Sequence, residues 1–195
     1  KKKFSKNKVF FQLKKNKIKF PVVIKPISEG SSIDVKISQN KKDLLKNIKK
    51  LFHKYNELLL ETFIGGKEIQ VAVLNNKALG AIELRPKRKF YDYKAKYTKS
   101  AKTDHIMPAD LNKKKYNEVL KISEKAHKLL NCRGVSRSDF KYYKNHFYIF
   151  ELNTQPGMTN LSLVPEIAAY KGINFENLVE KIIKDSSINK WEKNF

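Results

Sequence analysis

The pattern of apolar and polar positions changes along the chain between the period of two typical of strands and the period near 3.6 typical of helices. Strands are predicted at 20–26, 33–37, 58–64, 68–74, 78–84, 135–142 and 147–152. Helices are predicted at 41–54, 111–130, 162–170 and 175–184. The short turns after residues 74 and 143 make two pairs of strands into hairpins. This order of hairpins with helices between them predicts an α+β fold.

Two segments carry no clear period. In residues 1–20, Lys alternates irregularly with apolar residues, which predicts only a turn or a short strand. Residues 85–107 show no apolar pattern and are predicted to form one long loop. The helix at 111–130 is expected to turn these residues inward: Val119, Leu120, Ile122, Ala126, Leu129 and Leu130.

Composition narrows the class of protein. The chain has 195 residues and a formal net charge of +23, yet only four of its 42 basic residues are Arg. Spread-out Lys is typical of a solvated surface, although attraction for phosphorylated small molecules or nucleic acid stays open. One cysteine, Cys132, excludes an internal disulfide and suits a cytoplasmic protein. We expect no membrane partner, because no apolar run approaches ~18 residues and no signal peptide is visible.

Candidate chemistry concentrates on the second hairpin. If its turn takes three residues, 144–146, Asp139 lies opposite Glu151 and Arg137 opposite Asn153, all on one face. Two carboxylates and an amide oxygen are ligands that Mg²⁺ prefers. A solvent-facing strand surface with cross-strand ion pairs is the alternative.

Three further segments are suggestive but generic. The loop Lys25-Pro26-Ile27-Ser28-Glu29-Gly30-Ser31-Ser32 can lay backbone N–H groups around phosphate, or be an ordinary turn. The break at 65–66, between Glu61 and Glu68, offers backbone edges to a base and carboxylates to a ribose. Residues 90–97 interleave Tyr and Phe with Lys, which suits either base stacking or an active-site lid.

The combination is more specific than its parts. The motifs follow in the order Lys25-Pro26…Glu29-Gly30-Ser31-Ser32, Glu61…Glu68, Phe90-Tyr91-Asp92-Tyr93…Lys96-Tyr97, Arg137…Asp139, Glu151-x-Asn153-Thr154-x-Pro156-Gly157-Met158-Thr159 and Ser162-Leu163-Val164-Pro165. Together they resemble the D-alanine–D-alanine ligases of the ATP-grasp superfamily, from about residue 21 to 184. The resemblance implies a partial central ATP-binding domain at 1–67 and a C-terminal catalytic domain at 68–195, with an antiparallel sheet and flanking helices.

The resemblance also implies residue roles. Nucleotide contacts fall on Lys25, Ser31, Ser32, Glu61, Thr62, Phe63, Ile64, Glu68 and Lys96. Of these, Lys25 would hold the α- and β-phosphates, Lys96 the γ-phosphate and Glu68 the ribose. Ligands of two Mg²⁺ or Mn²⁺ ions fall on Asp139, Glu151 and Asn153. Catalytic roles fall on Arg137, Gly157, Ser31 and Tyr97. The carboxylate of the second substrate would bind at Ser162 and Leu163.

The implied activity is the ATP-dependent joining of two D-alanines through an acyl phosphate, for peptidoglycan precursors. In this family Tyr at the position of Tyr97 accompanies dipeptide formation, and Phe accompanies depsipeptide formation. The family's N-terminal domain, which binds the first D-alanine, has no counterpart here, so we expect the chain alone to make no dipeptide. A homodimer is expected only for the full-length protein.

Two alternatives remain: another ATP-grasp carboxylate–amine ligase, or a basic nucleic-acid-binding module. Specific nucleic-acid binding is not expected, because Lys is spread along the whole chain. We call the loop that carries Ser31 and Ser32 the serine loop. Asp34 departs from the family pattern, because this loop usually continues with Gly at that point.

Overall fold

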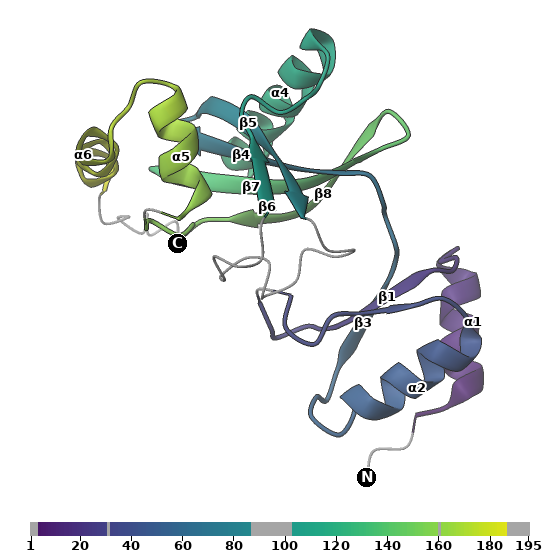
Figure 1. The fold of residues 1–195 in the computed structure, drawn as a ribbon. Helices are drawn as coiled ribbons and strands as arrows, with labels where there is room; N and C mark the ends of the chain where they lie inside the picture. The colour runs from purple at the N-terminus through teal and green to yellow at the C-terminus, as the bar shows by residue number, and fades with distance from the viewer. Residues whose placement is uncertain (1–3, 31, 87–102, 160, 187–195) are drawn as a thin grey trace, which may run out of the picture. The chain divides into compact units, whose positions relative to one another are not determined.

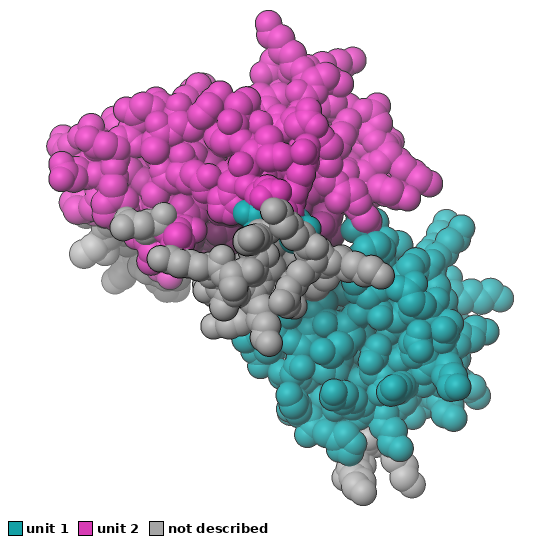
Figure 2. Space-filling model, viewed as in Figure 1, with its two compact units in different colours: residues 1–64, 86–103 teal, residues 65–85, 104–195 magenta. Residues whose placement is uncertain are grey.

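The computed structural model describes residues 4–30, 32–86, 103–159 and 161–186. The chain forms two compact units, shown in different colours in Figure 2. Unit 1 comprises residues 1–64 and 86–103, and unit 2 comprises residues 65–85 and 104–195. The division into domains at residue 67, which the resemblance implies, stays a prediction.

Unit 1 is a three-stranded sheet covered by two helices (Figure 1). Its strands are β1 (Val22–Pro26), β2 (Lys36–Ser38) and β3 (Leu58–Thr62), and its helices are α1 (Lys6–Lys15) and α2 (Lys41–Leu51). Strand β1 lies in the middle and pairs antiparallel with both neighbours. Alternate residues of β1 are buried, with Val22 and Ile24 in the core beside the helices, and the other face of the strand carries Val23 and Lys25.

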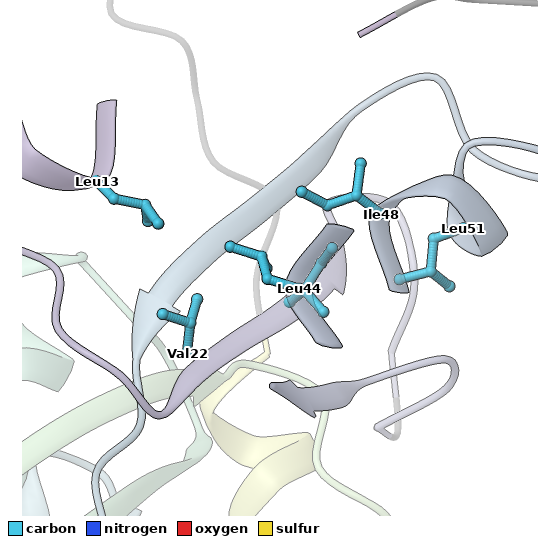
Figure 3. Packing of buried hydrophobic residues seen from close by; sticks show 6 residues of the cluster. Leu13, Val22, Leu44, Ile48 and Leu51 are labelled. Atoms are coloured by element: carbon cyan, nitrogen blue, oxygen red, sulfur yellow. The ribbon is translucent and has the colours of Figure 1, made fainter. Parts of the chain in front are cut away.

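The core of unit 1 joins both helices to β1. Figure 3 shows Leu13 of α1, Val22 of β1 and three residues of α2, Leu44, Ile48 and Leu51, pointing toward one another. All five are at most 5% exposed. The spacing of the α2 residues puts them on one helix face, and the Asn40 side chain caps the helix by accepting from the Asp43 N–H at 3.0 Å.

Helix α1 corrects the prediction of a turn or strand for the first twenty residues. Ser5 caps the helix, and Leu13 is its one buried residue among those described, with Val9 and Phe10 packed beside it. The apolar face of α1 is narrow and is interrupted by Lys residues, and Phe11 is exposed. The sequence of α1 therefore shows little of the apolar period of a helix, and the helix was not predicted.

Unit 2 is built on a five-stranded sheet in the order β6-β5-β4-β7-β8. The strands are β4 (Lys67–Leu74), β5 (Lys77–Pro86), β6 (Thr103–Ile106), β7 (Val135–Tyr143) and β8 (His146–Asn153). The helices are α4 (Lys113–Leu129), α5 (Leu163–Tyr170) and α6 (Phe175–Asp185). Helix α4 packs on the sheet face that carries Ile69, Val71 and Phe140, and α5 packs against α6. Both predicted hairpins, β4–β5 and β7–β8, are confirmed.

Two details of unit 2 differ from the prediction. Residues 103–106, assigned to a loop, form the edge strand β6, whose exposed polar residues give no apolar alternation. Leu129 and Leu130, expected inward, are 70% and 63% exposed. The buried stripe of α4 runs instead through Val119, Ser123 and His127, because residues four apart share a helix face.

Within the four described ranges, no helix is long and apolar enough to cross a membrane.

Candidate functional site

The hairpin β7–β8 has the register predicted for metal binding, but it reaches that register differently. Asp139 pairs with Glu151, and Arg137 pairs with Asn153. The turn has two residues, Lys144 and Asn145, both at positive φ (46° and 66°), as in a type I′ hairpin turn. The prediction of a three-residue turn is therefore wrong.

A bulge supplies the residue that the turn lacks. The register shifts between Asp139 and Phe140, because Phe140 pairs with Ile149 while Asp139 pairs with Glu151. Phe150 is the extra residue on β8 and is 48% exposed. The bulge brings Glu151 opposite Asp139, so the two carboxylates occupy neighbouring positions on one face.

Arg137 and Asp139 form a two-pronged ion pair on β7. The Arg137 Nε and Nη2 atoms donate to the two Asp139 carboxylate oxygens at 2.7 and 2.9 Å. Asp139 is only 8% exposed, and a buried carboxylate needs such a partner. On β8, the Asn153 Nδ2 donates to Glu151 Oε1 at 3.2 Å. The four predicted side chains therefore lie on two paired strands, joined by hydrogen bonds along each strand.

The donor set fits a hard divalent cation. Its oxygens come from two carboxylates, Asp139 and Glu151, and from the amide of Asn153, and Mg²⁺ is held in proteins by one or two carboxylates together with substrate phosphates. Among the described residues no group of three or more His, Cys, Asp and Glu could hold a metal ion. A metal ion at this hairpin would also need the Asn153 amide or a bound substrate as a ligand.

Gln70 is a residue of this site that the sequence did not reveal. It lies on β4 directly opposite Asp139, is 2% exposed, and its Oε1 accepts no hydrogen bond from the residues that the structure describes. An unpaired buried amide oxygen costs free energy unless a further group meets it. A cation-bound water is one such group, so Gln70 also fits a metal beside Asp139.

Glu68 also lies on this face and has a cationic partner. Its Oε2 accepts from Lys141 Nζ at 2.8 Å, and the two residues are directly opposite on β4 and β7. Lys141 is a second residue that sequence reasoning missed. The spacing of Arg137, Asp139 and Lys141, two residues apart on one strand, was the available signal.

The loop before α5 brings Gly157 and Ser162 together. A Cβ atom at Gly157 would lie 2.8 Å from Ser162 Oγ. Ser162 is the N-cap residue of α5, but its Oγ accepts from the Thr159 N–H at 3.0 Å rather than capping the helix. Leu163, the first residue of α5, is 8% exposed. The loop thus holds the Gly157 backbone close to the start of a helix, where the dipole favours an anion.

In unit 1, Lys25 and Glu61 form an ion pair. Lys25 Nζ lies 2.7 Å from Glu61 Oε2, and both side chains are about one-third exposed (32% and 38%). They lie on the β1–β3 face opposite the core, where Glu61 pairs with Val23. Thr62 pairs with Val22, and the Phe63 N–H donates to the Pro21 carbonyl at 3.0 Å.

Some of the remaining predicted site residues are described by the structure and others are not. Ile64 ends the first stretch of unit 1, and Ser32 lies in the loop after β1 with a positive φ of 61°. Ser31, Lys96 and Tyr97, with the rest of the aromatic segment at 90–97, lie outside the described residues.

Comparison with known proteins identifies the family. A family model described as D-ala D-ala ligase C-terminus matches residues 1–184. The D-alanine–D-alanine ligase of Pelagibacter ubique is 55% identical over 206 residues, covering 97% of this chain and 67% of the relative. The ligase of Geotalea uraniireducens is 47% identical over 169 residues, covering 86% of this chain and 54% of the relative.

Solved structures give the same result. A D-alanine–D-alanine ligase from Bacillus anthracis complexed with ATP matches with a TM-score of 0.73 and 30% identity, covering 87% of this chain and 53% of that one. A D-Ala:D-Ser ligase from Enterococcus faecalis matches with a TM-score of 0.79 and 28% identity, covering 94% of this chain and 54% of that one.

The fold is therefore the α+β fold of ATP-grasp enzymes, as the order of motifs predicts. The chain belongs to the D-alanine–D-alanine ligase C-terminal family. It spans between about half and two thirds of the length of the relatives named here.

Proposed function

We propose that this chain is the ATP-binding and ligating part of an enzyme that joins two D-alanines into D-alanyl-D-alanine. The observation that carries the proposal is the hairpin register, which sets Asp139 opposite Glu151 and Arg137 opposite Asn153, in a chain 55% identical to a D-alanine–D-alanine ligase. The product would serve as a peptidoglycan precursor.

Several residues of the motifs would bind ATP. Lys25 would leave Glu61 to bind the α- and β-phosphates, because a phosphate offers it more negative charge than one carboxylate. Glu68, held in place by Lys141, would accept hydrogen bonds from the ribose hydroxyls. Backbone groups of residues 61–64 would meet the adenine, and the serine loop with Lys96 would contact the outer phosphates.

Asp139, Glu151 and Asn153 would hold two Mg²⁺ or Mn²⁺ ions. Bound there, the ions would offset negative charge on the phosphate being transferred. Arg137 keeps the Asp139 carboxylate oriented through its two hydrogen bonds, and Gln70 lies opposite Asp139 on β4. The protein's own contribution is therefore a fixed set of oxygen atoms on two paired strands.

The reaction would take two steps. The carboxylate of the first D-alanine attacks the γ-phosphate of ATP and gives an acyl phosphate and ADP. The amine of the second D-alanine then attacks the acyl carbon, loses a proton and expels phosphate. Arg137 and the Gly157 N–H would stabilise the oxyanion of this second step, while Ser162 and Leu163 at the start of α5 would hold the second carboxylate.

D-alanine is favoured as the second substrate over other amines. The named curated relatives, at 55% and 47% identity, are D-alanine–D-alanine ligases, whereas the D-Ala:D-Ser ligase is 28% identical. We further propose that the full-length protein is a cytoplasmic homodimer and binds no specific nucleic acid.

A chimera tests the activity. The third of the Pelagibacter ubique ligase that this chain does not cover is joined in front of Lys1, and ADP release is followed with D-alanine as sole amino acid. Dipeptide detected by mass spectrometry supports the proposal. A folded chimera that binds Mg-ATP but forms no D-alanyl-D-alanine contradicts it.

Metal binding is tested separately by Mn²⁺ electron paramagnetic resonance. Glu151→Gln removes one carboxylate, so we expect Mn²⁺ affinity in the presence of ATP to fall by more than roughly tenfold. Glu176→Gln, the same change at an exposed position of α6, is the matched control. Equal affinity of both variants would place the metal elsewhere.

A further inference from the structure

Asp34 occupies an unusual backbone position just after the serine loop. Its φ is 54°, in the left-handed region, and Ser32 two residues earlier has a φ of 61°. Residues with side chains adopt this region at a cost, although Asp and Asn tolerate it better than most. A compensating interaction is therefore expected.

The Asp34 carboxylate makes two contacts with the segment that follows α2. Its Oδ2 accepts from the Tyr55 hydroxyl at 2.8 Å and from Lys54 Nζ at 3.0 Å. Asp34 comes from the loop between β1 and β2, and its partners lie twenty and twenty-one residues later. These contacts connect the serine loop to the end of a packed helix.

The contacts of Asp34 with Tyr55 and with Lys54 differ in strength. The Asp34 side chain is 18% exposed, whereas that of Lys54 is 62% exposed, so water weakens the ion pair. The hydrogen bond from Tyr55, followed by that from Lys54, lowers the pKa of Asp34. The same bond to Asp34 raises the pKa of Tyr55 to about 12. Tyr55 is therefore the stronger of the two partners.

Two backbone hydrogen bonds report on the loop itself. The Ile33 N–H donates to the Gly30 carbonyl at 3.0 Å, and the Val35 N–H donates to the Ser32 carbonyl at 3.4 Å. These amides lie on either side of Asp34, so they depend on its backbone conformation.

We propose that Asp34, Tyr55 and Lys54 form a clasp that fixes the backbone around Ser32 in one conformation, so that Ser32 is positioned for the phosphates of ATP. The clasp also places a cation beside a carboxylate that would otherwise repel those phosphates. The three are positioning residues, and their role toward ATP rests on the proposed function.

Amide hydrogen exchange measured by NMR tests the clasp without nucleotide. Asp34→Asn keeps the tolerance for positive φ but removes the charge, and Tyr55→Phe removes only the hydroxyl. In both variants we expect the Ile33 and Val35 amides to exchange roughly tenfold faster, the effect of losing a hydrogen bond to a charged group.

Two further variants sharpen this test. Lys54→Gln is expected to have a smaller effect, because the Lys54 side chain is largely exposed. Glu57→Gln, an exposed carboxylate in the same segment, is the matched control and should change neither amide. Unchanged exchange in Asp34→Asn and Tyr55→Phe overturns the clasp.

Calorimetry with Mg-ATP tests the positioning role. Asp34→Asn and Tyr55→Phe should weaken Mg-ATP binding by several-fold and leave adenosine binding unchanged, because adenosine has no phosphates. Faster exchange with unaltered Mg-ATP affinity overturns the positioning role, and an equal loss for adenosine shows general loosening instead. If the unmodified chain binds no Mg-ATP, nucleotide binding by this chain is refuted, and the exchange rates alone decide whether the clasp exists.

Discussion

Gly66, directly before β4, allows a quantitative prediction for the variant Gly66→Ala. Its φ is +88°, and a Cβ atom there would lie 2.2 Å from the Tyr142 carbonyl oxygen. Ordinary contacts need about 3.5 Å, so the backbone must move by roughly 1.3 Å. An alanine at this positive φ lowers the free energy of unfolding by ~1–2 kcal/mol, and the crowding of its Cβ atom against Tyr142 lowers it by ~1–3 kcal/mol. The expected loss of stability is therefore about 2–5 kcal/mol. The thermal midpoint of unit 2 should fall by roughly 5–20 °C.

Differential scanning calorimetry measures these thermal midpoints. Alanine variants of two other glycines separate the cost of the positive φ from the cost of the crowded Cβ atom. Gly172 has a φ of +78°, but a Cβ atom there would meet no described atom within 4 Å, so Gly172→Ala should lose only the strain part. Gly30 has neither feature, and Gly30→Ala should leave the transition unchanged. If Gly66→Ala loses no more stability than Gly172→Ala, the contact with Tyr142 carries no weight and the reasoning is refuted.

Three more predictions follow from other parts of the chain. His105 Nδ1 lies 2.7 Å from Glu166 Oε2, and this hydrogen bond raises the pKa of His105. The stability that this pair adds should be complete below about pH 6.5 and should be lost as the pH rises through the raised pKa of His105. The thermal midpoints of the unmodified chain and of His105→Gln should therefore converge at alkaline pH. A difference that stays constant with pH would contradict this. In the chimera, Tyr97→Phe should raise the share of D-alanyl-D-lactate at neutral pH, measured by mass spectrometry of products from mixed D-alanine and D-lactate, and an unchanged ratio would reject that role. The chain alone should bind Mg-ATP without making dipeptide, and efficient synthesis in the ADP-release assay would show that the part supplied by the chimera is not needed.

The hairpin β7–β8 shows what the sequence can and cannot predict. The shared face of Arg137 and Asp139, and that of Glu151 and Asn153, was predictable, because side chains two residues apart share a strand face. The opposition of Asp139 and Glu151 was predicted only by assuming a three-residue turn. The route to this opposition was not predictable, since a two-residue turn with a bulge and a three-residue turn without one give the same pairing at Asp139. Gln70 was missed because only the strand order places β4 beside β7.

Elements with weak patterns were the other source of error. Helix α1 buries Leu13 alone among its described residues, and the four residues of β6 are all at least partly exposed, so neither has an apolar period to read. In α4, Ser123 and His127 occupy buried positions that a hydrophobic count assigns to Leu129 and Leu130. His127 can be buried there because its Nδ1 lies 2.7 Å from Ser136 Oγ on β7, a partner that the helical period does not indicate.

The bulge at Phe150 also constrains which insertions and deletions the hairpin tolerates. Deleting Phe150 would remove the bulge and still leave Glu151 opposite Asp139, at the loss of a side chain that is 48% exposed. A single deletion elsewhere in the β8 half of the tip can be absorbed in the same way, because Phe150 would then enter the regular ladder. A single deletion in the β7 half cannot be absorbed in this way, because residues 137–143 of β7 are all paired with residues of β8 already. It would leave a second unpaired residue on β8. Protein engineers who graft a new tip can therefore shorten the β8 half by one residue without changing the pairing of Asp139 with Glu151.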